Sequence, residues 1–556
     1  MDEDNQVTSS SVLEETFYVT SKKNTYYKVK LTEKGLSLQK DSNGSTKIET
    51  IPLNDIIGCR CMRSKRRSAA GSCACRPGAS RMQLKLVESM DAFQTSYDEY
   101  DTSAYLYIYA YTLKKVRMKG IRRRERTTIT LRFRSFDKYE DNLREASRWR
   151  LAIKCLVTKL PVPKNLMSEN RKLLVLINPK SGPGRGREVF QKRIHPVLSE
   201  AERPYDIHIT KCSNYAREFV RTKDIYQWNG LLTVGGDGIV FEVVNGLFQR
   251  PDWEKALNEL PLGVIPCGSG NGLAKSIAYS KQEPYDYNPL LVSALSVVKC
   301  KKAPMDIVRI ETRSKILFSF LSVGWGLLSD IDIESERLRA IGGQRFTIWS
   351  VARLIGLRTY KGKISYLPFE SKSFHDACDD NTNELDLPLN GYRDDEVITE
   401  NITLETEIEG RQRLDSFYSA TSAKSTYFST GSVSSYHSID DDDIREPGEF
   451  IMVHAAYQSH LGQDYFFAPR AKLADGIIWL LIVKAGITRA NLLQFLLGLS
   501  TGTHVNCSGV DMIPVKAFRI EPAEGVSGHL TVDGEEVDYG PLQAEIFPSL
   551  ATVMTP

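Results

Sequence analysis

The sequence predicts an α/β lobe followed by a C-terminal antiparallel β-sandwich lobe, with a β-rich domain in front of both. Three observations predict this fold class. Short apolar runs alternate with amphipathic helical segments over residues 171–303, as in parallel α/β sheets. Residues 304–369 and 448–556 are rich in β-like runs, and so are residues 1–165. The 556 residues also exceed the roughly 250–300 at which a single hydrophobic core stops growing.

The first 165 residues contain short strand-like runs followed by one helix. The runs are Phe17–Thr20, Tyr26–Leu31, Leu36–Gln39, Met82–Val87, Ala104–Tyr111 and Thr127–Phe133. The helix is predicted from one apolar face, formed by Leu143, Ala146, Trp149, Ala152 and Ile153. Several strands closed by a helix with a buried Trp resemble a pleckstrin-homology-like sandwich, which implies a regulatory domain. Two stretches look irregular, namely Cys59–Ser80 and the basic Lys114–Arg126.

The composition excludes several classes of protein. A hydrophobic content of 41% excludes a wholly disordered chain, and a net charge of +4 is too balanced for coating nucleic acid. The longest dense apolar run, Ile477–Val483, is too short for a bilayer span, which needs about 20 residues. The acidic start Asp2–Asp4 is unlike a signal peptide. We therefore expect a cytoplasmic protein whose ten Cys are mostly reduced thiols.

Two segments separate the predicted domains. Residues 160–170 include Pro161 and Pro163 and are predicted to be a linker. Between Glu370 and Pro447 the chain is polar and rich in Ser, Thr and Asp. Such a composition cannot bury enough apolar area to offset the entropy of ordering. We therefore predict a disordered insertion over residues 370–447, within the C-terminal lobe.

The most specific motif is Thr233-Val-Gly-Gly-Asp-Gly-Ile-Val-Phe-Glu-Val-Val-Asn-Gly246, where a strand leads into a helix. Glycines at such a turn let backbone N–H groups approach phosphates, and the helix start adds the positive end of its dipole. Asp237 lies at the tip, where a carboxylate can accept the proton of a hydroxyl nucleophile. The structural alternative is an ordinary glycine-rich turn with Asp237 as a helix cap.

Two further glycine-rich turns favour the functional interpretation. The strand Leu173–Asn178 leads into Asn178-Pro-Lys-Ser-Gly-Pro-Gly-Arg-Gly186. The strand Leu262–Ile265 leads into Pro266-Cys-Gly-Ser-Gly-Asn-Gly-Leu-Ala274. Three such loops, each after a strand of one α/β sheet, are expected to converge on one crevice. None matches GxxxxGK[ST], which excludes a P-loop enzyme.

The order of these motifs resembles the catalytic region of diacylglycerol-kinase-type lipid kinases, and the region from Leu173 to Phe547 resembles a sphingosine kinase. Two further blocks narrow the resemblance. The block from Ser322 to Arg339, continuing to Phe346, is similar to the sphingosine-kinase block that contacts both substrates. The run Thr531-Val-Asp-Gly-Glu535 is similar to the last motif of that family. The resemblance implies ATP-dependent phosphorylation of the primary hydroxyl of sphingosine, which gives sphingosine 1-phosphate.

The resemblance also implies roles for individual residues. Asp237 would be the general base, and Glu242 would help to order the site. The nucleotide-binding residues would be Asn178, Ser181, Gly182, Thr210, Gly235, Gly268, Ser269, Asn271, Arg339, Arg345, Asp533, Gly534 and Glu535. Among them, Arg339 and Arg345 would hold ATP phosphates, and Asp533 and Glu535 would ligate Mg²⁺, an ion that prefers carboxylates.

For the lipid, the resemblance implies that Asp332 pairs with the ammonium group of the sphingoid base and that Ser322 also binds substrate. Without the resemblance, Asp332 and its acidic neighbours would be a solvated helix start. The segment Asn491–Leu499 is a short helix with apolar residues all round, so it is a core helix or a wall around the alkyl chain. The proposed wall residues are Leu327, Leu328, Ile331, Leu496 and His504.

Some features leave alternatives open. Many sphingosine kinases have Ser at the position of Gly235. A glycine at this position is also seen among diacylglycerol and ceramide kinases. Ceramide or diacylglycerol kinase activity is therefore one alternative, and a membrane-binding adaptor with an inactive kinase fold is another. The basic segment Lys114–Arg126 is a solvated loop, a contact to anionic membranes or a nuclear-import signal.

The cysteine pairs Cys59/Cys61 and Cys73/Cys75 lack zinc-site spacing, and we expect unmodified surface thiols ahead of palmitoylation. The partners implied are a sphingoid base and an anionic membrane surface bound peripherally, at the plasma membrane or endomembranes, with no transmembrane span and no nucleic acid. The sequence leaves a homodimer and a nuclear location open.

Overall fold

The computed structural model describes most of the chain, in two compact units. The described residues are 12–18, 26–42, 45–65, 83–86, 100–115, 122–158, 172–341, 344–369, 437–438, 448–525 and 527–556. The first unit comprises residues 1–303 and 551–556, and the second comprises residues 304–550. The first unit contains a β-rich N-terminal domain and an α/β domain.

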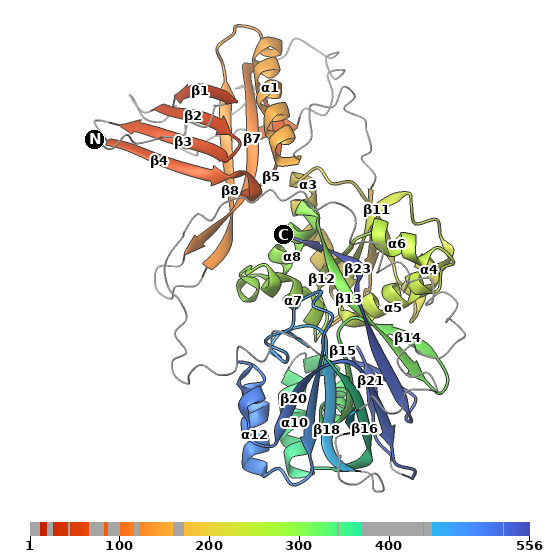
Figure 1. The fold of residues 1–556 in the computed structure, drawn as a ribbon. Helices are drawn as coiled ribbons and strands as arrows, with labels where there is room; N and C mark the ends of the chain where they lie inside the picture. Colours follow the sequence, from red (N-terminus) through yellow and green to blue (C-terminus); the bar gives the residue numbers. More distant parts are fainter. Residues whose placement is uncertain are drawn as a thin grey trace, which may run out of the picture. The chain divides into compact units, whose positions relative to one another are not determined.

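The N-terminal domain has two antiparallel sheets and one long helix, α1 (Tyr139–Thr158) (Figure 1). The first sheet has the order β1 (Leu13–Tyr18), β2 (Tyr26–Thr32), β3 (Gly35–Ser42) and β4 (Ser45–Pro52). The second has the order β6 (Gln83–Leu86), β5 (Ile56–Lys65), β7 (Tyr100–Lys115) and β8 (Arg122–Phe133). A 3₁₀ turn, η1 (Leu53–Asp55), joins the two sheets.

The core of this domain corrects the interpretation of its first cysteines. Cys59 and Cys61 lie in β5 and are buried, so the prediction of an irregular stretch with surface thiols is wrong for these two residues. Burial raises the pKa of the Cys59 thiol to about 12, which keeps it protonated and unreactive. Both pack in one cluster with Trp149 of α1, the Trp that the sequence placed in the core. Cys73 and Cys75 lie outside the described residues.

The α/β domain has a parallel sheet with the order β10 (Tyr205–Ile209), β9 (Lys172–Ile177), β11 (Trp228–Gly235) and β12 (Leu262–Pro266). Strands β9, β11 and β12 are almost entirely buried, as expected for a sheet covered on both faces. The helical elements are α2 (Gly186–Val189), a π-helical turn η2 (Phe190–Ile194), α3 (His195–Glu200), α4 (Tyr215–Thr222), α5 (Asp237–Phe248), α6 (Trp253–Glu259), α7 (Gly272–Ser280), η3 (Tyr285–Tyr287) and α8 (Pro289–Lys299).

The second unit is mostly antiparallel β structure, as predicted. Its strands are β14 (Ile316–Ser319), β15 (Ser322–Gly326), β16 (Tyr360–Pro368), β18 (Gly448–Ala456), β19 (Ile478–Lys484), β20 (Val510–Pro522), β21 (Leu530–Val532) and β22 (Glu535–Val537). Strands β13 (Lys301–Thr312) and β23 (Leu542–Thr555) run across the boundary between the units. The helical elements are α9 (Leu327–Ser335), η4 (Glu336–Ile341), α10 (Gln344–Ile355), α12 (Arg489–Gly498) and η8 (Thr503–Asn506).

The predicted insertion falls almost wholly outside the described residues. Within residues 370–447 the structure describes only β17 (His437–Ser438), which pairs with Ser365 and Tyr366 of β16. None of the helices in the described ranges is long and apolar enough to span a bilayer.

Candidate functional site

The three glycine-rich loops of the α/β domain touch one another backbone to backbone. A side chain at Gly182 of the first loop would collide with the carbonyl of Cys267 in the third. A side chain at Gly268 of the third loop would collide with the Cα of Gly236 in the second. The loops follow β9, β11 and β12, whose carboxyl ends meet at one edge of the sheet. The convergence expected from the sequence is therefore present.

Gly235 is tightly enclosed in this structure. A Cβ at this position would lie 2.7 Å from Cγ2 of Ile239 and 2.9 Å from Oγ of Ser181. A serine here would need Ile239 or Ser181 to move. The glycine that departs from the common sphingosine-kinase pattern is therefore matched to its own surroundings, and it leaves the neighbouring Asp237 in place.

Asp237 is the buried carboxylate at the centre of these loops. It begins α5 and is 9% exposed. Its carboxylate oxygens accept hydrogen bonds from the N–H groups of Gly272 (2.9 Å) and Leu273 (3.3 Å), at the start of α7. Burial raises the pKa of Asp237, while these N–H groups act in the opposite direction. The carboxylate is thus held at a helix N-terminus, and it caps α7 from another element rather than its own helix α5.

The side chains of the loops close the loops on themselves. Asn271 has a left-handed backbone (φ 62°), and its side chain bonds both the N–H (2.9 Å) and the carbonyl (2.8 Å) of Gly268. Asn178 accepts a bond from the N–H of Lys180 (3.0 Å). Ser181 is buried beside Gly235, and Ser269 is half-buried. These loops are pre-formed, which suits backbone recognition of phosphates.

Glu242 of α5 binds a neighbouring loop. Its carboxylate accepts bonds from the N–H groups of Asn214 (3.0 Å) and Ala216 (2.9 Å), where α4 begins. The same loop starts at the buried Thr210, whose N–H donates to the carbonyl of Ile177 (2.8 Å). Glu242 therefore orders the segment that carries Thr210 and does so without lying among the glycine-rich loops.

In the second unit, the two later motifs form neighbouring strands. β15, from the Ser322 block, pairs with β21, from the Thr531 motif, with Val323 opposite Val532. The hydroxyls of Ser329 and Thr531 are 2.9 Å apart. A Cβ at Gly534 would lie 3.2 Å from Oδ2 of Asp332. Motifs about 200 residues apart in the sequence therefore build one region.

Asp533 accepts four hydrogen bonds from residues 319–322, three of them at Oδ1. Its carboxylate accepts bonds from the Ser319 hydroxyl (2.6 Å) and from the N–H groups of Phe320 (3.1 Å), Leu321 (2.9 Å) and Ser322 (3.0 Å). Burial raises its pKa to about 7 against the effect of these donors. Glu535, the other predicted metal ligand, is exposed. Among the described residues, no group of three or more His, Cys, Asp or Glu side chains could hold a metal ion.

Asp332 and Arg345 form an ion pair. Arg345 is 3% exposed in its side chain, and it contacts Glu336 at 2.6 Å and Asp332 at 3.2 Å. The guanidinium predicted to hold ATP phosphates therefore orients the carboxylate predicted to hold the lipid. Arg339 lies in η4, and its side chain is outside the described residues. Asp330 is buried and bonded to Tyr360, so it is not part of a solvated helix start.

The predicted lipid wall lies in one apolar cluster. Leu327 and Ile331 of α9 share this cluster with Leu492 and Phe495 of α12, and Leu328 and Leu496 pack against it. His504 is fully buried, and its Nε2 lies 2.8 Å from the carbonyl of Phe467, to which a neutral ring donates. Burial lowers the pKa of His504, which keeps it neutral. The helix 491–499 is thus partly core.

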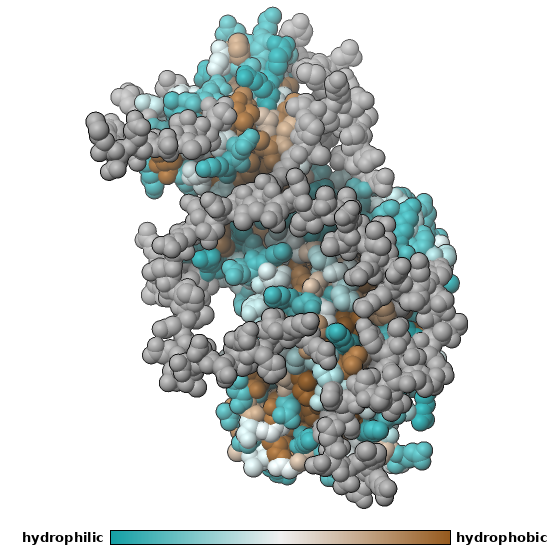
Figure 2. Space-filling view, in the orientation of Figure 1, coloured by the Kyte–Doolittle hydropathy of each residue, from teal (hydrophilic) through white to brown (hydrophobic). Residues whose placement is uncertain are grey.

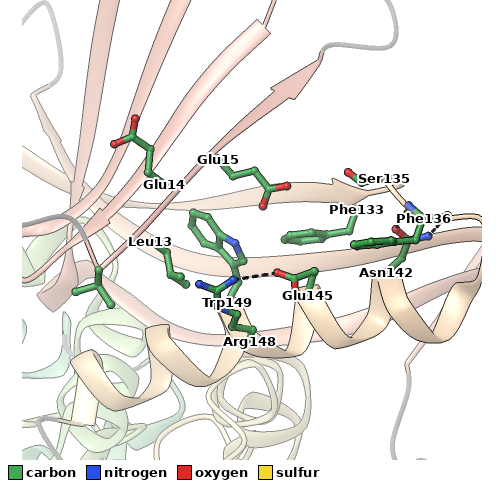
Figure 3. Close-up of a pocket in the computed structure, with 11 residues that line it drawn as sticks. Leu13, Glu14, Glu15, Phe133, Ser135, Phe136, Asn142, Glu145, Arg148 and Trp149 are labelled. Carbon is green, nitrogen blue, oxygen red and sulfur yellow. Dashed lines mark hydrogen bonds and ion pairs between the residues drawn. The ribbon is translucent and has the colours of Figure 1, made fainter.

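One pocket lies away from the predicted site, in the N-terminal domain. It measures about 390 Å³ and is lined by residues of β1, α1 and the end of β8 (Figure 3). Figure 3 shows Glu14 and Glu15 on β1, with Glu145, Arg148 and Trp149 on α1. None of the predicted site residues lines it. Its polar residues already bond within the domain, since Arg148 pairs with Glu145.

The basic segment Lys114–Arg126 has intramolecular partners. Arg124 contacts Asp55 at 2.5 Å and Glu283 at 2.6 Å, and Arg126 contacts Glu200 at 2.5 Å. Residues 116–121 lie outside the described residues. The interpretation of the whole segment as a solvated loop is therefore wrong for Arg124, whose side chain is 10% exposed.

Sequence reasoning missed Tyr285, which lies near Asp237, and Lys275, which lies over the Tyr285 ring. Tyr285 is 3% exposed, and its pKa is raised by burial and by the nearby carboxylate of Asp237. Lys275 of α7 lies 5.3 Å from the centre of the Tyr285 ring and pairs with Asp286. No motif or spacing marks these two residues in the sequence.

Comparison with known families defines the class of this site. Residues 172–310 match the diacylglycerol kinase catalytic domain, and residues 408–555 match the YegS C-terminal NAD kinase beta sandwich-like domain. The first match covers the glycine-rich loops, and the second covers β18 to β23 with the Thr531 motif. The fold class predicted for the two later lobes is confirmed.

Curated relatives narrow the class to one family. The chain is 32% identical to sphingosine kinase 2 of Homo sapiens, in an alignment that covers 82% of each protein. It is 33% identical to sphingosine kinase 1 of Homo sapiens, covering 70% of this chain and 91% of the relative. It is also 33% identical to sphingosine kinase 1 of Caenorhabditis elegans, covering 66% of this chain and 77% of the relative. The chain belongs to the sphingosine kinase family.

Proposed function

We propose that this protein transfers the γ-phosphoryl group of ATP to the primary hydroxyl of sphingosine, giving sphingosine 1-phosphate. The observation that carries the proposal is Asp237, a buried carboxylate where three glycine-rich loops meet. It accepts the hydroxyl proton as the oxygen attacks phosphorus, which requires Asp237 to be ionised. Family membership supports the same reaction.

The nucleotide phosphates bind at the glycine-rich loops, where Gly182, Gly235 and Gly268 allow close approach of the backbone. ATP carries Mg²⁺, which usually binds proteins through one or two carboxylates together with substrate phosphates. The exposed Glu535 fits such a ligand. Asp533 is a poorer ligand, because its buried carboxylate already accepts four hydrogen bonds, so we give it a structural role beside Glu535.

Asp332 binds the ammonium group of the sphingoid base, and Arg345 orients it. The ammonium can take over part of the ion pairing that Arg345 now provides to Asp332 at 3.2 Å. This frees one edge of the guanidinium for a phosphate, since guanidinium groups bind phosphates in a bidentate way. The alkyl chain packs on the cluster of α9 and α12, which gains about 0.8 kcal/mol per buried CH₂.

A substrate panel tests the reaction. The purified protein is incubated with labelled ATP and sphingosine, dihydrosphingosine, ceramide or diacylglycerol. We expect phosphorylation of the two sphingoid bases, since ceramide and diacylglycerol lack the ammonium that pairs with Asp332. Preferred transfer to ceramide or diacylglycerol would favour the alternative enzymes, and no transfer to any lipid would favour an adaptor.

Substitution of Asp332 tests the head-group assignment. Asp332→Asn should raise KM for sphingosine more than tenfold and KM for ATP only a few-fold, since ion pairs that are partly buried contribute about 1.5–3 kcal/mol. Glu336→Gln is the matched control, because it removes the other carboxylate that contacts Arg345. If both variants changed the two KM values alike, Asp332 would act through Arg345 alone.

We also propose that the N-terminal domain is pleckstrin-homology-like. Its two antiparallel four-stranded sheets and the C-terminal helix α1, which buries Trp149, support this assignment. The resemblance implies a regulatory role for this domain.

Peripheral membrane binding is supported by a surface of α10 and α12 in the second unit. Ile348, Val351 and Ile355 are 49%, 55% and 70% exposed and recur on one face of α10. Leu493 and Leu497 of the contacting helix α12 are 44% and 68% exposed. Figure 2 shows apolar residues in the region of these helices. We propose that this surface enters the headgroup region of a cytoplasmic membrane leaflet and takes up the lipid there.

Vesicle binding tests this surface. Replacing Val351, Ile355 and Leu497 with Gln should reduce co-sedimentation with vesicles of phosphatidylcholine and phosphatidylserine at least tenfold, because each large apolar side chain contributes about 1.5–3 kcal/mol on burial. Activity on detergent-solubilised sphingosine should stay within about twofold, since membrane affinity does not enter that assay. Unchanged sedimentation would leave the basic segment as the remaining candidate, and Arg122→Ala would test it.

A further inference from the structure

The N-terminal domain is docked on the α/β domain through backbone and charged contacts. A side chain at Gly58 of β5 would collide with the carbonyl of Glu200, the last residue of α3. Arg150 of α1 bonds Glu202 at 2.9 and 3.1 Å. Ile57 and Tyr111 also share an apolar cluster with α3 and α8. This contact is therefore close and specific, with a glycine where the two backbones meet.

Arg124 makes the most buried ion pairs of this contact among the described residues. Its guanidinium bonds Glu283 through two nitrogens (2.8 and 2.6 Å), Asp55 (2.5 Å) and the carbonyl of Tyr111 (3.0 Å). The side chains of Arg124 and Glu283 are 10% and 9% exposed. Such a forked geometry fixes both position and direction of the carboxylate. Glu283 belongs to the α/β domain, just beyond α7.

Glu283 closes the C-terminus of α7. Its N–H donates to the carbonyl of Ala278 (3.0 Å), and that of Gln282 donates to Tyr279 (2.9 Å). These two bonds form a Schellman motif, in which the residue before Glu283 is left-handed. Glycine usually holds that place, but here it is Gln282 with φ 53°. A non-glycine residue in this conformation is strained, and it persists when its surroundings fix it.

The other end of α7 holds Asp237. The N–H groups of Gly272 and Leu273 bond its carboxylate, as described above. After the turn, Tyr285 donates its N–H to the carbonyl of Glu283 (2.8 Å) and places its side chain near Asp237. Lys275, in the middle of α7, covers the Tyr285 ring and pairs with Asp286. One short segment, α7 with its turn, thus joins Arg124 to Asp237.

We propose that Arg124 of the N-terminal domain is a positioning residue for the catalytic site. Through Glu283 it holds the strained turn at Gln282, and so fixes α7 and Tyr285 around Asp237. The inference rests on the proposed role of Asp237 as the base. The N-terminal domain therefore does more than carry a regulatory fold, because the α/β domain needs it to set the geometry of phosphoryl transfer.

The experiment compares Arg124→Met with Arg150→Met in the full chain. Arg150 is a matched control, since it spans the same contact and pairs with Glu202, away from α7. We expect Arg124→Met to lower kcat about tenfold, with both KM values within about twofold, because small displacements of reacting groups cost rate rather than binding. Arg150→Met should change kcat no more than about twofold. Amide exchange of residues 278–286 should quicken in Arg124→Met alone.

The variant Gln282→Gly distinguishes loss of support for the turn from a general loss of contact between the N-terminal and α/β domains. Glycine relieves the left-handed strain, so the turn needs less support. In the Arg124→Met background, Gln282→Gly should restore kcat to within about threefold of the unchanged protein. Glu283→Gln, which weakens the same pair from the α/β side, should lower kcat in the same way as Arg124→Met. It provides the test if Arg124→Met fails to fold.

Two results would overturn the inference. One is equal loss of kcat in Arg124→Met and Arg150→Met, with no recovery from Gln282→Gly. The other is unchanged amide exchange of residues 278–286 in both Arg124→Met and Glu283→Gln. The exchange measurement does not depend on the chemical role of Asp237. Full activity of Asp237→Asn would instead overturn the proposed base and leave the measured support of the turn standing.

Discussion

Asp237 and Asp533 are both buried carboxylates followed by glycine in motifs of the same family resemblance, yet their surroundings differ. Asp237 accepts two hydrogen bonds, at 2.9 and 3.3 Å, from the start of α7. Asp533 accepts four, all from Ser319 to Ser322. Asp237 is thus held at the start of a helix among the glycine-rich loops, whereas Asp533 joins two motifs that lie more than 200 residues apart.

The first prediction tests Asp237 as the general base. Asp237→Asn should lower kcat by roughly 10²–10⁴, because general-base catalysis contributes that much and an amide cannot accept the proton. ATP affinity should stay within a few-fold, since little volume changes. Steady-state kinetics and nucleotide titration check this prediction. Turnover near that of the unchanged protein would remove Asp237 from the mechanism.

The second prediction tests the structural role of Asp533. Asp533→Asn turns an amide N–H₂ toward backbone N–H donors, so the free energy of unfolding should fall by about 1–3 kcal/mol, the cost of leaving buried N–H groups without an acceptor. Urea denaturation measures this change. Asp511→Asn, at an exposed position in β20, is the control and should change stability by less than about 0.5 kcal/mol. Similar stability of the two variants would contradict the structural role.

Sequence motifs predict a structural feature well where residues close together in the sequence form it. The glycine-rich loops follow buried strands directly, so their meeting at one sheet edge was predictable from periodicity and topology. The same holds for the cluster of Leu327, Ile331 and the helix near Phe495, where apolar residues had to be buried. Local chemistry and the parallel sheet rule were sufficient.

Sequence reasoning fails where a partner comes from far along the chain. Arg124 looked like one charge in a basic run, but Asp55 and Glu283 bury it. The cysteines of β5 looked irregular because Gly58 and basic residues interrupt the apolar pattern, although the strand packs on α1. The partners of Asp533 are more than 200 residues away, and no spacing rule finds them.

The third prediction concerns the pH dependence of the stability that Asp533 contributes. The pKa of Asp533 is about 7 in the folded protein against an ordinary 3.8, so its protonated form is favoured by folding. Its contribution to stability is therefore complete below about pH 4 and is lost as pH rises to about 7, by at most about 1.4 kcal/mol per pH unit. Unfolding at several pH values should show this slope in the unchanged protein and not in Asp533→Asn. An identical slope in both proteins would assign it to other groups.

The last and smallest effect concerns Glu242 of α5, which bonds the backbone where α4 begins. Glu242→Gln keeps one acceptor for the N–H groups of Asn214 and Ala216 but turns an amide N–H₂ toward the other. We expect a loss of about 1 kcal/mol in the local stability of residues 210–216, which appears as faster amide exchange and a few-fold rise in KM for ATP through Thr210. Glu218→Gln on α4 is the control, because Glu218 is exposed and pairs with Arg221 one turn further along the same helix. If Glu218→Gln raised KM equally, the effect would follow from charge on α4 rather than from the two backbone bonds, and Glu242 would have no part in ordering the nucleotide site.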